Sequence, residues 1–309
     1  MRPGSILYVN GLRLVRLRLE YLALQGLLKI FCILPEAGAY RLGEGLGSLV
    51  FWIDRRHQRV AIDNLRIAFG KEKDEQELKA IARRSYQHLG QSLAELARAL
   101  ASPPDKIMAA VSIEGLDHFL EAHKNGRGVL YLTAHLGNWE WMALVQSLKG
   151  YAMNVVARPV DNPFLEGLLS RLRTRWGNRV VKKGGALRKV LKLLNQGETI
   201  GFLLDQNVAP DQGVFVNFFG QPACTHKTLA LLALKTGASV LPAFTFRQGG
   251  NRHRIIIEPP VMLEETGDLQ RDVVANTQKF TSVIESYVRQ HPDQWLWVHR
   301  RWKTQPEQR

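Results

Sequence analysis

The sequence is poor in cysteine. Its 309 residues include only Cys32 and Cys224, so at most one disulfide can form, and a small secreted scaffold held by several disulfides is excluded. Two cysteines are also too few for a zinc site built from four thiolates. Glycine and proline, at 26 and 13 residues, are close to ordinary levels, which excludes collagen-like and low-complexity chains. Because 45% of the residues are hydrophobic and 23% are charged, the chain can bury a core and is not disordered.

Motifs for nucleotides and for zinc are absent from the sequence as well. The lysines and glycines of 182–185 do not form the G-x4-G-K-[ST] loop, and no G-x-G-x-x-G follows a predicted strand. The nine histidines show no H-E-x-x-H spacing. The sequence therefore gives no support to nucleotide hydrolysis or to zinc-dependent hydrolysis.

Acidic residues are outnumbered by basic ones. The chain has 42 Lys and Arg against 28 Asp and Glu, a formal net charge of +14. Such a surface favours anionic partners: phospholipid, phosphorylated sugar, acidic protein or nucleic acid. The basic residues are spread along the chain and form no recognised DNA- or RNA-binding motif. We therefore expect no nucleic-acid partner, and a basic non-catalytic binder of membranes or nucleic acid is the alternative from another functional class.

The N-terminal region lacks a hydrophobic run long enough for a straight transmembrane helix. Its most apolar stretch, 21–34, has 14 residues and includes Gln25 and Lys29, whereas a span needs about 20. Arginines before it argue against a cleaved signal peptide. A second apolar, glycine-spaced stretch, 43–53, ends beside Arg55 and Arg56. We expect helices that lie in the headgroup layer of a membrane; two core helices of a soluble protein, or a span that begins before Tyr21, are the alternatives.

The order of the predicted elements indicates an α/β protein with a helical N-terminal third. Helices are expected over 36–69 and 74–100, the second behind a capping box formed by Asp74 and Glu77. From Val111 onward, short β-rich runs alternate with helical stretches. The predicted strands are 128–134, 152–157, 199–204, 239–246 and 254–258, and the predicted helices are 138–149, 162–176, 185–196, 225–236 and 270–289.

We therefore expect a mixed, largely parallel central sheet flanked by helices. Residues 1–110 would form a helical, membrane-associating region, and residues 111–309 would form the α/β body, the two folding as one unit. The chain ends in a segment, 294–303, that is dense in tryptophan and cationic residues.

His135 directly follows a predicted buried strand and begins the segment H-L-G-N-W-E. Five residues apart on one helix, His135 and Glu140 would point away from each other. They can meet if His135 lies at the strand end, Gly137 turns the chain and Glu140 lies in the first helical turn. A carboxylate on one imidazole nitrogen leaves the other as a base, so the attacking hydroxyl would come from the substrate. The alternative is a strand-end histidine and a solvated glutamate without a chemical role.

Further polar residues follow neighbouring predicted strands. Arg158 ends the second strand and could hold a phosphate, and Asp205 and Gln206 follow the third, where they could orient a sugar or phosphate. Thr225 is predicted to cap the helix 225–236, whose N-terminus could receive an anion. A surface arginine, a turn and a simple cap are the corresponding alternatives.

The motif H-L-G-N-W-E resembles that of the late acyltransferases of lipid A biosynthesis, the lauroyl/myristoyl acyltransferase family within the lysophospholipid acyltransferase superfamily. Similar blocks cover roughly residues 20–303. They are 157–159 with 162–163, 201–206, 219–225 and 295–302.

The resemblance implies a transferase of lipopolysaccharide biosynthesis at the cytoplasmic face of the bacterial inner membrane. It implies His135 as general base, Glu140 as its partner, and Arg158 and Asp205 near the substrate. Gln206 and Thr225 remain predicted substrate contacts from their positions in the sequence alone. The donor would be an acyl thioester on acyl carrier protein or coenzyme A, and the acceptor a hydroxyl of an anionic glycolipid, a lipid A precursor. No cofactor is needed, because a thioester is already activated. A lysophospholipid, another glycolipid or an aminolipid is the alternative acceptor, since L-G-N-W between His135 and Glu140 differs from many lipid A members.

Overall fold

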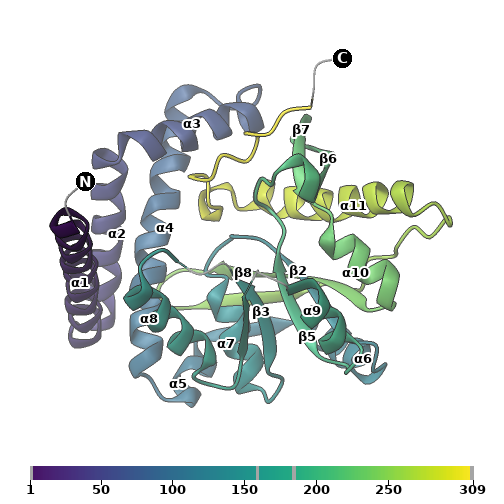
Figure 1. Ribbon diagram of the computed structural model, residues 1–309, viewed down its shortest axis with the longest axis horizontal. Coiled ribbons are helices and arrows are strands. Elements are labelled where there is room, and N and C mark those ends of the chain that lie inside the picture. Colours follow the sequence, from purple (N-terminus) through teal and green to yellow (C-terminus); the bar gives the residue numbers. More distant parts are fainter. Residues whose placement is uncertain (1–2, 158–159, 183–185, 307–309) are drawn as a thin grey trace.

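The N-terminal third of the computed structural model is helical (Figure 1). The structure describes residues 3–157, 160–182 and 186–306. The first helices are α1 (Pro3–Ile33), α2 (Glu36–Ile53), α3 (Arg55–Phe69), α4 (Glu75–Ala101) and α5 (Pro104–Ala109).

Two of these helices replace the single helix predicted over 36–69. The chain breaks at Asp54, which leaves the helical conformation (φ −83°, ψ 72°) and caps α3 by accepting the backbone N–H of His57. The prediction for 74–100 is confirmed by α4. Asp74 accepts the N–H groups of Gln76 and Glu77, and the Glu77 carboxylate accepts the N–H of Asp74, which completes the predicted capping box.

The body is built on a mixed, largely parallel sheet, as predicted. The main-sheet strands are β1 (Val111–Glu114), β2 (Val129–Thr133), β3 (Met153–Ala157), β4 (Arg179–Lys182), β5 (Thr199–Leu203), β8 (Ser239–Arg247) and β9 (His253–Ile257). Over the described residues their order is β1-β9-β8-β2-β5-β3-β4, and of these pairs β8–β9 is antiparallel. The five predicted strands are present within a residue or two of their expected bounds.

Helices cover both faces of the sheet because successive strand residues point to opposite sides. On β2, Leu130 and Leu132 pack in a cluster with α9 (Ala186–Leu194), α10 (Thr228–Thr236) and α11 (Leu269–Gln290). Val129 and Tyr131 face the cluster of α5, α6 (Leu116–Lys124) and α7 (Glu140–Leu148). The first cluster also contains Phe51 and other residues of α2, α3 and α4, so the helical third and the sheet share one core.

Four strands were missed by the sequence analysis. Two are the short edge strands β1 and β4, and two form a separate antiparallel hairpin, β6 (Gly213–Phe218) and β7 (Gln221–His226). The prediction of a helix over 225–236 was wrong at its start: Thr225 lies in β7, and α10 begins at Thr228. The chain turns at Phe219 and Gly220, both with positive φ (53° and 75°), which is the backbone of a tight hairpin turn.

The glycine-spaced segment of α2 packs against α4. A Cβ on Gly47 would collide with the Tyr86 carbonyl oxygen, and one on Gly43 would lie 2.6 Å from the Gly90 carbonyl oxygen. The glycines therefore allow the two helix backbones to touch.

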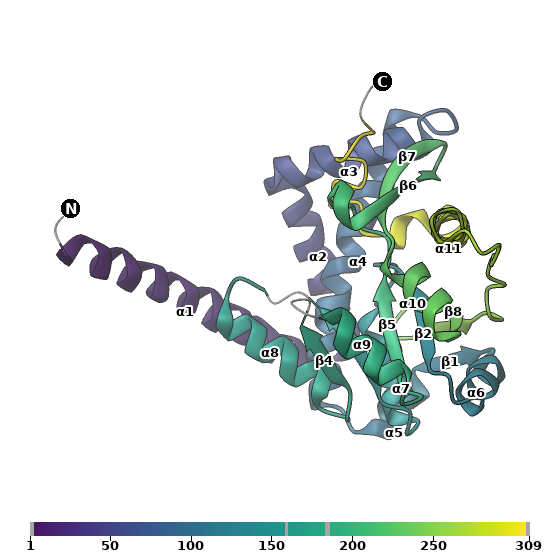
Figure 2. The same cartoon turned by 45° about the vertical axis from the view of Figure 1, so that its right-hand side comes forward.

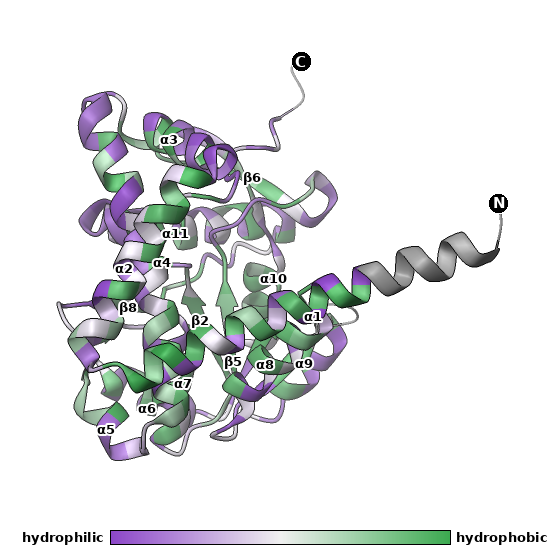
Figure 3. Cartoon of the chain, turned by 90° about the vertical axis from the view of Figure 1, so that its left-hand side faces the viewer, coloured by the Kyte–Doolittle hydropathy of each residue, from purple (hydrophilic) through white to green (hydrophobic). Residues whose placement is uncertain are grey.

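The first helix is attached to the body by its C-terminal half. Phe31 is fully buried, Arg98 of α4 donates to the Phe31 and Leu34 carbonyls, and Asn162 at the start of α8 (Pro163–Thr174) donates to the Leu17 carbonyl. Toward its N-terminal end α1 leads away from the body (Figure 2). Along the part whose side chains are described, apolar and polar stretches alternate (Figure 3). No described helix is both long and apolar enough to cross a bilayer.

Candidate active site

The register of two neighbouring parallel strands brings His135 and Asp205 together. Thr133 of β2 pairs with Leu203 of β5, and each polar residue follows two positions later. The Nδ1 atom of His135 lies 2.8 Å from Asp205 Oδ1, and the backbone N–H of His135 donates to Asp205 Oδ2 at 2.9 Å. The pair lies beyond the carboxyl ends of the strands, where open α/β sheets bind their ligands. The His135 side chain remains 15% exposed to solvent.

Asp205 is an anion held inside the protein. Its side chain is 2% exposed and takes a third hydrogen bond, from the indole N–H of Trp295 at 2.8 Å. Burial by itself raises the pKa of Asp205, but the charge of His135 and the hydrogen bonds from His135 and Trp295 outweigh it and lower this pKa to about 2. An ionised Asp205 accepts the Nδ1 proton of His135. The Nε2 atom of His135 is then the nitrogen free to take a proton.

Glu140 does not hold His135 in the structure, and the prediction of that contact was wrong. Glu140 is the first residue of α7, and its carboxylate forms a two-pronged ion pair with Arg173 of α8, with Arg173 Nη2–Glu140 Oε1 at 2.5 Å and Arg173 Nε–Glu140 Oε2 at 3.1 Å. Burial lowers the pKa of Arg173, but the hydrogen bonds to Glu140 raise it above its ordinary value. The carboxylate that contacts the imidazole is that of Asp205, which follows β5, because β5 pairs with β2.

The loop between His135 and Glu140 is held from several sides. Gly137 adopts φ +59°, as expected for a turn there, and a Cβ at this position would collide with the Thr245 carbonyl oxygen. Asn138 is buried and donates to Glu95 Oε2 of α4 at 2.8 Å. Glu95 also receives Nε and Nη2 of Arg247 from β8, at 2.7 and 2.8 Å. The imidazole of His135 meets the Trp139 ring edge-to-face at 4.9 Å.

Of the other predicted site residues, Gln206 lies at the same sheet edge as His135, whereas Thr225 lies in the separate β6–β7 hairpin. Gln206 is half-buried and follows Asp205 directly, at the same edge of the sheet. Thr225 is fully buried in β7, where its hydroxyl accepts from Arg301, so it does not cap a helix. Arg158 lies outside the described residues. The N–H of Gly137 donates to the Gln294 carbonyl.

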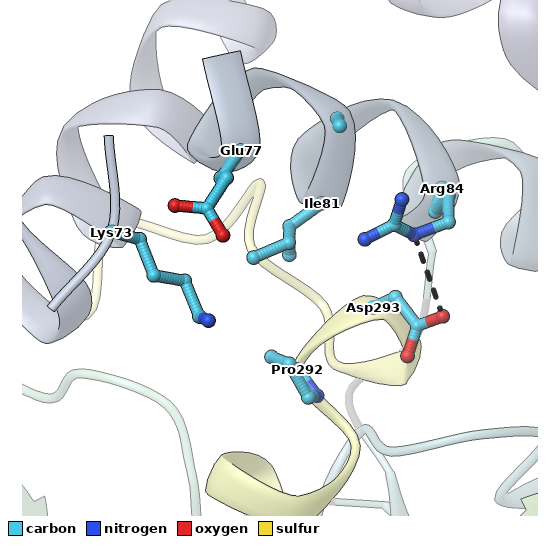
Figure 4. A pocket seen from close by; sticks show the side chains of 7 residues that line it. Lys73, Glu77, Ile81, Arg84, Pro292 and Asp293 are labelled. Atoms are coloured by element: carbon cyan, nitrogen blue, oxygen red, sulfur yellow. Dashed lines mark ion pairs between the residues drawn. The ribbon is translucent and has the colours of Figure 1, made fainter. Parts of the chain in front are cut away.

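Two hollows lie near these residues. A narrow cavity of about 10 Å³ adjoins the Glu140–Arg173 pair. Its remaining lining comes from α4, α7, the end of α8 and the turn that follows α8, and it is mostly apolar: Leu96, Ala143, Leu144, Leu172, Trp176 and Asn178. A larger cavity of about 380 Å³ lies between α4 and the turn η2 (Pro292–Gln294), where Arg84 faces Asp293 (Figure 4). No predicted site residue lines the larger cavity.

Sequence reasoning missed two residues of this site and one contact of a third. Trp295 belongs to the tryptophan-dense tail, whose sequence pattern predicts no specific role for it. Arg173 lies in a predicted helix with other arginines, and nothing in its local pattern distinguishes it. Asp205 was predicted at this edge, but as a substrate ligand rather than as the partner of His135.

Comparison with known proteins decides the family. The family model for bacterial lipid A biosynthesis acyltransferases matches residues 12–304. The chain belongs to this acyltransferase family. The acyltransferase is 28% identical over 284 residues to the lipid A biosynthesis lauroyltransferase of Escherichia coli K12, covering 91% of this chain and 90% of the relative.

Other similar proteins are also acyltransferases of lipid A biosynthesis. The acyltransferase is 25% identical to the E. coli K12 lipid A biosynthesis myristoyltransferase, covering 85% and 79% of the two chains. It is 29% identical to a lipid A biosynthesis acyltransferase of Haemophilus influenzae, covering 91% and 88%. The resemblance read from the sequence is confirmed, and the enzyme is an O-acyltransferase of lipid A biosynthesis.

Proposed function

We propose that this enzyme moves a fatty acyl chain from a thioester to a hydroxyl of a lipid A precursor, with His135 as the general base. One observation carries this assignment: an accessible imidazole at the carboxyl edge of the sheet has its Nδ1 bound to a buried, ionised carboxylate. Because the chain belongs to an acyltransferase family, we assign the other ring nitrogen of His135, Nε2, to the acceptor hydroxyl.

In the proposed step, His135 Nε2 takes the proton of the acceptor hydroxyl as that oxygen attacks the thioester carbonyl carbon. Asp205 stabilises the imidazolium that forms. The tetrahedral intermediate then collapses, the carbon–sulfur bond breaks, and the thiolate takes the proton from His135 Nε2. An ester and a free thiol result, and His135 returns to its neutral form. A positioned base contributes about 10²–10⁴-fold to such a rate.

The Glu140–Arg173 pair would shape the site beside this chemistry. The pair ties the first turn of α7, directly after the His135 loop, to α8. We place the acyl chain against the apolar side chains of α4, α7 and α8 that line the adjoining cavity; at about 10 Å³ this cavity has room for about one water, so the helices would have to move apart to admit the chain. In this reading Glu140 acts on α8 and not on the His135 ring.

The donor and the membrane are further parts of the proposal. The net charge of +14 suits an acidic acyl carrier protein or acyl-CoA as donor, a phosphorylated glycolipid as acceptor, and anionic phospholipid. Residues 1–110 would contact the cytoplasmic face of the inner membrane, and residues 111–309 would carry the chemistry. In support, the end of α2 exposes Leu49, Trp52 and Ile53 beside the exposed Arg55 and Arg56.

Mass spectrometry of the lipid product tests this function. The purified protein, given an acyl thioester and a lipid A precursor in detergent, should add one acyl mass to the precursor. His135→Ala should abolish the product while the protein stays folded. The matched control is His118→Ala on α6, which precedes the amino end of β2. Full turnover by His135→Ala, or acylation of a lysophospholipid in place of the lipid A precursor, would contradict the proposal.

A further inference from the structure

The C-terminal tail pairs with the loop that carries His135. Leu136 and Trp295 form an antiparallel bridge. On one side of it the N–H of Leu296 donates to the His135 carbonyl at 3.0 Å, and on the other the N–H of Gly137 donates to the Gln294 carbonyl at 2.8 Å. The tail therefore fixes the backbone on both sides of the bridge, at His135 and at Gly137.

The same tail residue reaches the carboxylate that serves His135. The indole N–H of Trp295 donates to Asp205 Oδ2 at 2.8 Å, and the His135 backbone N–H donates to the same oxygen at 2.9 Å. These two donors leave Oδ1 for the Nδ1 proton of His135. When fixed donors hold one oxygen of a carboxylate, the direction in which its second oxygen points is fixed as well.

Trp295 itself has little freedom to move. It is 2% exposed, and its ring meets those of Trp297 and Phe218 edge-to-face at 4.5 and 5.7 Å. A side chain locked in this way can hold a hydrogen bond without paying the rotamer entropy that a mobile donor would lose.

The backbone of the tail is anchored around Trp295 from other elements. Asn64 of α3 donates to the Trp297 and His299 carbonyls, at 2.7 and 2.6 Å. The N–H of Asn207 donates to His299 Nε2 at 2.9 Å. The buried Arg301 donates to the Cys224 carbonyl at 2.9 Å and to the Thr225 hydroxyl. The bridge to the His135 loop is thus part of a rigid segment.

We propose that Trp295 is a positioning residue of the acyl-transfer site, whose indole N–H holds Asp205 in the orientation that serves His135. This inference rests on the proposed function and adds to it a role for the tail. Three cationic or ionisable groups face Asp205: His135 from the end of β2, and His299 and Arg301 from the tail. Of the tail residues, Trp295 makes the direct hydrogen bond to the carboxylate.

The test compares two Trp→Phe variants within the tail. Trp295→Phe keeps an aromatic ring in the core but removes the N–H. Trp302→Phe is the matched control, because the indole nitrogen of Trp302 is buried and finds no hydrogen-bond partner among the described residues. Trp295→Phe should lower kcat by about ten- to a hundredfold, the effect of one hydrogen bond to a charged group. KM for thioester and acceptor should stay unchanged, and Trp302→Phe should keep wild-type kcat.

A double-mutant cycle separates positioning from simple packing. In an Asp205→Ala background the indole has no carboxylate to hold, so adding Trp295→Phe should cause no further loss of kcat. Additive losses, or equal losses in Trp295→Phe and Trp302→Phe, would overturn the inference.

An exchange measurement distinguishes this inference from the proposed function. In ¹⁵N-labelled protein, the Trp295 indole proton is identified by its absence in Trp295→Phe. This proton should exchange with solvent more slowly in wild type than in Asp205→Ala. Equal exchange rates would overturn the inference even in an active enzyme. A wild-type protein that transfers no acyl chain while showing this difference would contradict the proposed function and leave the Trp295–Asp205 contact established.

Discussion

One carboxylate decides which nitrogen of His135 carries the proton. Asp205→Asn places an amide where the carboxylate was, and the amide N–H₂ can donate toward Nδ1. The proton of the neutral imidazole would then move to Nε2, which could no longer take the proton of the acceptor hydroxyl. We expect kcat to fall by about 10²–10⁴-fold, with KM unchanged. Steady-state kinetics with a labelled acyl thioester measures both values.

The matched control for Asp205→Asn is Asp211→Asn, at an exposed aspartate in the short turn η1 (Pro210–Gln212). This substitution makes the same chemical change eight residues after the end of β5, and it should leave kcat unchanged. If Asp205→Asn retained wild-type turnover, Asp205 would not orient His135.

At this scale the sequence indicated His135 but not its partner. The H-x4-E spacing places Glu140 close to His135 along the chain, and local pattern alone favours it as the acid. The actual partner lies 70 positions away and depends on the pairing of β2 with β5, Thr133 opposite Leu203. No periodicity within either strand encodes that register. Asp205 was nevertheless expected at this edge, because parallel strands end on the same side.

The strands and helices of the body were easier to predict than its short elements. Strands β2 and β5 are apolar runs bounded by turns, and α11 shows a long helical period, so each was predicted nearly as it is. The strands β1 and β4 have four residues each, too few for a pattern to stand out. The β6–β7 hairpin contains Pro222, which argues against a strand, although the hairpin is a two-stranded ribbon where proline is tolerated.

The α7–α8 ion pair can be tested as a unit. If Glu140 acts by holding α8, Glu140→Ala and Arg173→Ala should lower turnover to a similar extent, because each leaves a partly buried charge without its partner. The double variant should be no worse than either single one. Thioester turnover and thermal unfolding of the three variants measure this.

The control for the ion pair is Arg171→Ala, at an exposed arginine on the same helix, and it should behave like wild type. A large loss in Glu140→Ala combined with full activity in Arg173→Ala would instead support a direct action of Glu140 on His135, as the family resemblance implies.

At the scale of the whole molecule, a buried charge cluster joins the helical third to the sheet. Glu95 of α4 is 1% exposed and contacts Arg247 of β8, His253 of β9 and Asn138. Burial raises the pKa of Glu95, but the nearby His253 imidazole, 3.4 Å away, and the charge and hydrogen bonds of Arg247 outweigh burial and lower this pKa to about 2. The cluster therefore stabilises the fold only while Glu95 is ionised.

This cluster predicts a pH dependence of stability. A carboxyl whose folded pKa is below its ordinary value of 4.5 contributes stability above about pH 4.5, and the contribution is lost as the pH falls toward 2. Glu95→Gln should lower the free energy of unfolding by about 3–5 kcal/mol at pH 7, because Arg247 is left buried without its anion. The difference from wild type should narrow as the pH falls from 5 to 3. Urea unfolding across this range measures it, and Glu44→Gln, at an exposed residue of α2, should show no such trend.

The exposed apolar side chains at the end of α2 lead to a prediction about the whole molecule on a membrane. Ile53 is 69% exposed and is followed by the exposed Arg55, Arg56 and Arg59, so this end of α2 can insert an apolar side chain while cations meet anionic headgroups. Burying an isoleucine is worth about 1.5–3 kcal/mol. Ile53→Glu should therefore reduce partitioning onto phosphatidylglycerol-containing vesicles by about tenfold or more in a flotation assay.

The matched control is Met262→Glu, which makes the same kind of change at a side chain that is 82% exposed, in the segment that leads into α11. The start of α11 lies on the side of the molecule away from α2 (Figure 1). Met262→Glu should leave partitioning unchanged, because that side would face the aqueous phase when α2 meets the bilayer. Raising the salt concentration should weaken binding of wild type and of both variants, since the arginine contribution is screened. Equal partitioning of Ile53→Glu and wild type would show that the end of α2 does not contact the membrane, and the proposed orientation would then be wrong.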